Sequence, residues 1–139
     1  MLLGYLFDAS SFIKALKLGK PEVLIDNFIQ WLTIYEVVNA LWREVYLLKF
    51  ASTEKVLQLV DIVTDVVKYM KILSISNIEK EVLKISIELG LTAYDTSYIV
   101  LAQKHRLTLV TEDKKLMNKA QKHINVTSLD TLLNHHQSN

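Results

Sequence analysis

Four acidic residues lie in sequence contexts where carboxylates could do chemistry: Asp8, Glu36, Asp95 and Asp113. Hard divalent ions such as Mg²⁺ and Mn²⁺ prefer oxygen ligands, so carboxylates suit them better than His or Cys side chains. A bound ion of this kind can activate a water molecule and neutralise the charge that builds on a phosphate during hydrolysis. If the acids meet in space, they could therefore support metal-dependent cleavage of a phosphodiester.

Each acid also has a purely structural interpretation. Residues 33–36 and 92–95 both match the capping box, in which a Thr hydroxyl and a later acid bond the free amides at a helix start. Asp113 fits an ordinary N-cap, and an acid near a helix N-terminus is stabilised by the helix dipole. Sequence order alone does not decide whether the acids are caps, ligands or both.

The elements that would position these acids alternate between short β-like runs and helical patterns. Strands are predicted at residues 3–7, 28–31, 71–75, 107–110 and 124–127. Helices are predicted at residues 11–18, 34–48, 53–70, 78–89, 92–105, 114–122 and 129–134. Strands separated by helices connect through parallel crossovers, so we expect a three-layer α/β/α sandwich with a parallel sheet of about five strands.

The predicted elements bring the acids toward one edge of the sheet. Asp8, Glu36 and Asp113 each follow a predicted strand, and open α/β sheets bind ligands at the carboxyl ends of their strands. Asp95 begins a helix whose centre, residues 98–102, is apolar on every side, so its carboxylate is expected to face the interior. An isolated buried charge would be costly, whereas a charge paired with a metal ion is not isolated.

Composition excludes several classes of protein. The chain has 139 residues, 50% of them apolar, so we expect one domain over residues 1–134 followed by a polar tail at 135–139. A net charge of +1 means that any nucleic-acid binding depends on local patches, and three Gly residues cannot build a Walker loop. The absence of Cys excludes disulfides and thiolate metal sites, and no apolar run is long enough for a membrane span. We expect a cytoplasmic protein without a membrane partner.

Four motifs together resemble the PIN-domain family: FDAS at residues 7–10, TIYEVVNAL at 33–41, TAYDTSYIVLA at 92–102 and LVTED at 109–113. Each motif is weak alone, but they occur in the right order, on the expected elements, and the resemblance covers essentially the whole chain. Within the family, the chain is most similar to the stand-alone VapC-type toxins of toxin–antitoxin pairs. The resemblance implies a sheet of order 3-2-1-4-5, acids that bind Mg²⁺ or Mn²⁺, and endonuclease activity on RNA.

Carried over residue by residue, the resemblance assigns the acidic quartet to Asp8, Glu36, Asp95 and Asp113. We expect all of them to be catalytic, with Asp8, Asp95 and Asp113 holding the metal ion directly or through water. Glu36 would hold a second ion or align the attacking water. None of the family's acids is missing, which argues against an inactive copy.

Neighbouring polar residues match supporting positions of the family. Ser10 and Thr111 match hydroxyls that orient the acids, and Asn39 matches a frequent companion of the Glu. Glu112 beside Asp113 leaves open which of the two acids faces the metal, although the spacing from Thr111 favours Asp113.

Basic residues near the predicted rim are candidates for contact with RNA phosphates, chiefly Arg43, Lys14 and Lys114. The alternative is that they are solvated surface residues. Arg43 shares a helix face with Glu36, and it could equally form an ion pair with Glu36 or Glu44.

Aromatic residues recur along one side of the predicted helix at 34–48: Tyr35, Trp42 and Tyr46. We expect this face to pack on the neighbouring helix at 53–70, and the alternative is an interface enriched in aromatic residues. The resemblance implies a homodimer and a VapB-like antitoxin that blocks the acidic groove. The competing functional hypothesis is a non-catalytic PIN-like module that binds RNA or a protein, with the acids serving as caps.

Overall fold

The computed structural model describes residues 1–137 and contains one parallel sheet. Its strands are β1 (Tyr5–Phe7), β2 (Phe28–Gln30), β3 (Lys71–Leu73), β4 (Thr108–Val110) and β5 (Val126–Thr127). They are ordered β3-β2-β1-β4-β5, and every neighbouring pair is parallel, so the predicted order is confirmed. Each strand is shorter than predicted, although at β1 the flanking Leu3 N–H still donates to Arg106 O at 2.7 Å.

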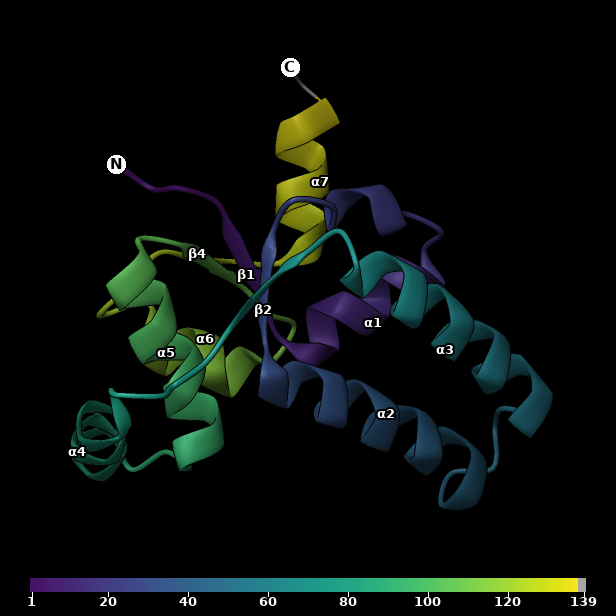
Figure 1. The fold of residues 1–139 in the computed structure, drawn as a ribbon, viewed down its shortest axis with the longest axis horizontal. Coiled ribbons are helices and arrows are strands. Elements are labelled where there is room, and N and C mark those ends of the chain that lie inside the picture. The colour runs from purple at the N-terminus through teal and green to yellow at the C-terminus, as the bar shows by residue number, and fades with distance from the viewer. Residues whose placement is uncertain (138–139) are drawn as a thin grey trace.

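Helices cover both faces of the sheet (Figure 1). They are α1 (Ala9–Lys17), α2 (Trp31–Tyr46), α3 (Thr53–Val67), α4 (Glu79–Leu89), α5 (Ala93–His105), α6 (Lys114–Ala120) and α7 (Leu129–Gln137), with a short 3-10 turn at Pro21–Val23. Helices α1, α2, α3 and α7 lie on one side, and α4, α5 and α6 lie on the other. The predicted three-layer sandwich is confirmed. None of the helices in the described part of the chain is long and apolar enough to cross a membrane.

Two hydrophobic clusters hold the layers together, one on each face of the sheet. Successive strand residues point to opposite faces, so Phe7 of β1 packs in the cluster with α1, α2, α3 and α7. Leu6, its neighbour, packs in the cluster with α5 and α6. Leu6 pairs with Leu109 of β4 and Phe7 with Val110, and all of these side chains are fully buried. The carboxyl ends of β1 and β4 are therefore fixed side by side.

The start of α2 differs from the prediction. Helix α2 begins at Trp31, and the backbone N–H of Gln30 donates to the Thr33 hydroxyl at 3.2 Å. Thr33 is therefore inside the first turn and does not cap the helix. The predicted capping box of Thr33 with Glu36 is wrong, because the helix starts earlier and Glu36 lies in its second turn.

The outer face of α2 is exposed. Tyr35 and Tyr46 keep 75% and 65% of their surface accessible, and Trp42 stacks on Tyr46 with ring centroids 5.5 Å apart. The preferred prediction, that these aromatic residues pack on the following helix, is therefore wrong. Helix α3 instead packs into the core through Val56 and Val63, on the side where α2 buries its aliphatic residues.

The C-terminal helix is longer than predicted. Helix α7 continues to Gln137, past the predicted end of the helix at residue 134. Residues 135–137 contain no Gly or Pro that would end a helix, so the helical backbone extends into the predicted tail. Residues 138–139 of that tail lie outside the described residues.

Candidate active site

The predicted acids Asp8, Glu36, Asp95 and Asp113 all line one open pocket, with a volume of about 1130 Å³. We call the pocket that these four acids line the acidic pocket. It lies where β1, β2 and β4 end and the helices that follow them begin, which is the ligand-binding edge of an open α/β sheet. Its volume far exceeds that of a single ion, so it could also admit part of a polymeric substrate.

Asp8 is the most firmly held acid of the pocket. It is 6% exposed and caps α1, and its Oδ1 accepts from Ser10 Oγ at 2.7 Å and from Ser11 N at 3.0 Å. The Thr111 hydroxyl donates to Oδ2. Burial raises the pKa of Asp8, while these hydrogen bonds oppose the increase by stabilising the carboxylate.

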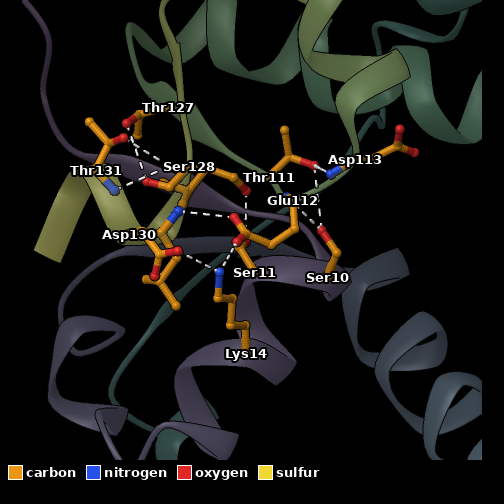
Figure 2. Close-up of polar contacts among 12 residues, drawn as sticks. Ser10, Ser11, Lys14, Thr111, Glu112, Asp113, Thr127, Ser128, Asp130 and Thr131 are labelled. Carbon is orange, nitrogen blue, oxygen red and sulfur yellow. Dashed lines mark hydrogen bonds and ion pairs between the residues drawn. The ribbon is translucent and has the colours of Figure 1, made fainter.

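The hydroxyls of Ser10 and Thr111, which donate to Asp8, also contact the turn between β4 and α6. Figure 2 shows their contacts with this turn. Ser10 Oγ accepts from the backbone N–H of Glu112, and Thr111 Oγ1 accepts from that of Asp113, both at 3.0 Å. Each hydroxyl thus donates to Asp8 and accepts from a backbone N–H of the turn that carries Asp113. This contact sets the position of Asp113 relative to Asp8.

Glu36 is half-buried, and its side chain is hydrogen-bonded by a residue of α5 instead of a residue of its own helix. The Tyr98 hydroxyl donates to Glu36 Oε1 at 2.5 Å and also lies 2.9 Å from Thr33 Oγ1. Burial raises the pKa of Glu36, the Tyr98 hydrogen bond opposes this, and the negative charges of Asp8 and Asp95 raise it further. Burial and the charge of Glu36 raise the pKa of Tyr98 far above its ordinary value, so the phenol keeps its proton.

Sequence reasoning missed Tyr98, which it treated as one residue of the apolar centre of α5. Its ring is indeed buried, being 1% exposed. The available signal was its spacing from Asp95, because residues three apart share a helix face. A buried tyrosine hydroxyl also usually needs a hydrogen-bond partner, which an acid of the same pocket supplies.

Asp95 begins α5 and is half-buried at the pocket wall. Its backbone N–H donates to the Thr92 hydroxyl at 3.2 Å, so Thr92 caps the helix as predicted. Its carboxylate accepts no hydrogen bond within residues 1–137, and its pKa is raised by burial and then by the charges of Asp113 and Asp8. Lys115 partly offsets these effects.

Asp113 is exposed and caps α6, as predicted. Its Oδ1 accepts from the backbone N–H groups of Lys115 and Leu116 at 2.9 and 3.1 Å. Oδ2 accepts neither of these hydrogen bonds. Asp113 could therefore cap α6 through Oδ1 and bind a metal ion through Oδ2.

Glu112, the neighbour of Asp113, turns the other way (Figure 2). Its Oε1 accepts from Lys14 Nζ at 2.6 Å, and its Oε2 accepts from the backbone N–H of Leu129 at 3.0 Å. Lys14 also contacts Asp130 at 2.9 Å. We call Lys14, Glu112 and Asp130 the clamp, because they join α1, the β4–α6 turn and α7.

The predicted RNA contacts separate into two groups. Arg43 lines the acidic pocket, as does Asn39, the predicted companion of Glu36, whereas Lys14 and Lys114 do not. Lys14 is engaged by the acids of the clamp. Glu44 pairs with Lys17, and no ion pair of Arg43 with Glu36 or Glu44 is found in the described part of the chain.

The acidic pocket fits a divalent cation in its chemistry. Within residues 1–137, none of its four acids forms an ion pair with Lys, Arg or His, and three of them have raised pKa values. The same residues contain no group of three or more potential ligands close enough together to hold an ion directly. Mg²⁺ commonly keeps several waters and uses one or two carboxylates, so the oxygen donors fit an ion bound partly through water.

The fold is an α/β/α domain in which four acids line an open pocket at the carboxyl edge of a parallel sheet. A family model for the PIN domain matches residues 5–122. The chain therefore belongs to the PIN-domain family, and its similarity to the VapC type is confirmed by its identity to Exonuclease VapC9, given below.

The chain is similar to Exonuclease VapC9 from Pyrobaculum aerophilum, with 38% identity over 100 residues, which cover 70% of either protein. It is also similar to a solved structure, the crystal structure of PAE2754 from Pyrobaculum aerophilum, which aligns over 100% of both chains with a TM-score of 0.78 and 31% identity. The likeness thus extends from sequence motifs to the whole fold.

Proposed function

We propose that the protein is a Mg²⁺- or Mn²⁺-dependent endoribonuclease and the toxin of a toxin–antitoxin pair. The observation that carries the proposal is the acidic pocket, in which four acids from separate elements lie together without a cationic partner among the described residues. The relative named Exonuclease VapC9 supports nuclease activity. An RNA substrate would place the activity in the cytoplasm.

In the proposed reaction, the chain's own residues position the water and the phosphate. Asp8, Asp95 and Asp113 would hold the ion, directly or through water, and the bound ion would supply an activated water and neutralise charge on the phosphate. Glu36 would hold a second ion or accept a hydrogen bond from the attacking water. Arg43, exposed at the pocket wall, would bind a phosphate of the substrate.

Supporting residues keep these groups in place. Ser10 and Thr111 hold Asp8 through hydrogen bonds, and Asn39 lines the pocket one helical turn from Glu36. Lys14 is better explained as part of the clamp than as an RNA contact, since two acids already neutralise it. Lys114 is exposed outside the pocket and remains a candidate for contact farther along a bound strand.

The direct test is RNA cleavage by the wild type and by Asp95→Asn, each with Mn²⁺ and with EDTA. We expect cleavage only by the wild type with metal. Asn keeps the size of the side chain and removes its charge, so the substitution tests the carboxylate. Metal-independent cleavage, or full activity of the variant, would exclude the proposed mechanism. A wild type that cleaves no RNA with or without metal would favour the non-catalytic module whose acids are only caps.

A second substrate separates internal cleavage from cleavage at chain ends. A circular single-stranded RNA has no ends, so an endonuclease opens it and an exonuclease leaves it intact. The open pocket supports passage of a continuous strand. Degradation of the linear RNA alone would replace the endonuclease proposal with exonuclease activity.

We further propose that the chain forms a homodimer and binds a VapB-like antitoxin. The exposed aromatic face of α2, formed by Trp31, Tyr35, Trp42 and Tyr46, supports a protein interface, because exposed aromatic clusters are typical of binding surfaces. Light scattering of the isolated chain would test the dimer. Co-expression with the candidate antitoxin, followed by an activity assay of the complex, would test inhibition.

A further inference from the structure

Tyr98 connects α5 to the acidic pocket through a ring that is fixed in the core. The residue is 1% exposed and belongs to the hydrophobic cluster that packs α5 against Leu6 and Leu109 of the sheet. It nevertheless contributes to the pocket lining. Because the ring cannot move without disturbing the core, the position of its hydroxyl is set by the packing of α5 on the sheet.

The hydrogen bonds around this hydroxyl form a chain with a defined direction. The backbone N–H of Gln30 donates to Thr33 Oγ1 at 3.2 Å, and the Tyr98 hydroxyl donates to Glu36 Oε1 at 2.5 Å. A tyrosine hydroxyl has only one proton, so in the 2.9 Å contact between them Thr33 donates and Tyr98 accepts. The chain thus runs from the end of β2 to Glu36.

Glu36 depends on this contact more than Asp8 depends on any single partner. Asp8 is held by three hydrogen bonds, from the hydroxyls of Ser10 and Thr111 and the backbone N–H of Ser11. Glu36 has a longer side chain with more rotatable bonds, and Tyr98 is its hydrogen-bond partner in the described structure. With Oε1 engaged, Oε2 is the oxygen left for an ion or a water in the pocket.

We propose that Tyr98 is a positioning residue that holds Glu36 in its working orientation, with Thr33 supplying the proton that directs the Tyr98 hydroxyl. The inference rests on the proposed nuclease function and goes beyond it by assigning a role to a core residue. Fixing a reacting group before the substrate arrives increases the rate of the chemical step. Its loss should therefore lower kcat more than it changes KM.

The first test is Tyr98→Phe, which removes the hydroxyl and keeps the ring. We expect kcat for RNA cleavage to fall about tenfold, with KM changed by less than about twofold, the size expected for one charge-assisted hydrogen bond. Tyr69→Phe is the matched control, because Tyr69 is also a tyrosine, is 64% exposed and lies outside the acidic pocket. It should keep wild-type kcat.

A double-mutant cycle distinguishes positioning of Glu36 from a general structural role. Glu36→Asp shortens the side chain so that its carboxylate no longer reaches the phenol. If Tyr98 acts through Glu36, then Tyr98→Phe should cost less than about twofold in the Glu36→Asp background, under single-turnover conditions. A further tenfold loss in that background would overturn the inference, because the effects would be independent.

Thr33 provides a second pair of variants in case Tyr98→Phe is unstable. Thr33→Ser keeps the proton donor and should keep wild-type kcat, whereas Thr33→Val should lower kcat in the same direction as Tyr98→Phe. Equal activity of Thr33→Val and the wild type would count against the directed chain. If the wild type cleaves RNA and Tyr98→Phe cleaves it equally well, this inference alone is overturned. If the wild type shows no metal-dependent cleavage, the proposed function is overturned as well.

Discussion

Glu112 and Asp113 are adjacent in the chain, yet they belong to two regions that treat carboxylates in opposite ways (Figure 2). In the clamp, Glu112 and Asp130 share the charge of Lys14, and Glu112 also accepts from the backbone of α7. In the acidic pocket, Asp113 lies with three acids that have raised pKa values.

The difference shows which acids are available for chemistry. An acid that is neutralised by a lysine and bonded to a backbone amide is already satisfied, so it stabilises the fold and does not need another cation. Acids that lie close together without a cation repel one another and favour any ion that binds between them. The clamp therefore holds the turn, and the turn presents Asp113 to the pocket.

The largest expected effect compares the two neighbours directly. Asp113→Asn should lower the rate of metal-dependent RNA cleavage by about 100-fold or more, since it removes a proposed ligand. Glu112→Gln should change the rate by less than about threefold, because its carboxylate faces the clamp. Initial rates on one labelled RNA measure both. Equal losses of cleavage rate in the two variants would contradict the assignment of Glu112 to the clamp and Asp113 to the acidic pocket.

The next effect is on stability in the presence of metal. Millimolar Mn²⁺ should raise the Tm of the wild type by several degrees, because an ion that binds only the folded state stabilises it. Asp95→Asn should remove most of this shift. Asp130→Asn is the matched control from the clamp and should keep the full shift. Differential scanning calorimetry with EDTA as the baseline would check the three proteins.

A smaller effect concerns pH in the absence of metal. Burial, followed by the charges of Asp113 and Asp8, raises the pKa of Asp95, so the folded state binds its proton more tightly than the unfolded state. The stability that this proton contributes is present below the unfolded value, near pH 4, and is lost as pH rises through the raised folded value. The Asn side chain of Asp95→Asn cannot ionise. The free energy of unfolding of this variant should therefore increase relative to that of the wild type as pH rises.

Urea unfolding in EDTA at pH 4.5 and pH 7.5 would measure this difference. We expect the free energy of unfolding of Asp95→Asn to exceed that of the wild type by about 1 kcal/mol or less at the higher pH, since the side chain is only half-buried. The difference should shrink at the lower pH. A variant that loses stability relative to the wild type at the higher pH would contradict the repulsion in the pocket.

The smallest effect is expected for the clamp itself. Lys14→Met should lower the free energy of unfolding by about 0.5–1 kcal/mol, because the Lys14 side chain is 34% exposed and Asp130 is more exposed still. The loss should diminish in high salt, which screens the wild-type pair. Thermal melts at low and high salt would test this, and a loss of several kcal/mol would make the clamp a larger part of the fold than proposed.

The sequence by itself determined the fold class, the strand order that the family resemblance implies, and the identity of the four acids. Alternating apolar patterns and helix starts are local properties, and parallel crossovers have few alternative arrangements. The Asp113 and Thr92 caps could be predicted for the same reason. The start of α2 could not be predicted in this way, because Gln30 and Thr33 are both possible caps of the helix. The helix begins directly after Gln30, so Glu36 lies beyond its first turn.

Only the tertiary structure decided which of these residues meet. Tyr98 and Glu36 are 62 positions apart, and Lys14 and Glu112 are 98 apart, so their contacts depend on how helices pack across the sheet. The same packing left Tyr35 and Tyr46 on the surface, where local periodicity had suggested a buried face. The direction in which Glu112 and Asp113 point depends on the partners that distant elements supply, and a sequence does not state those partners.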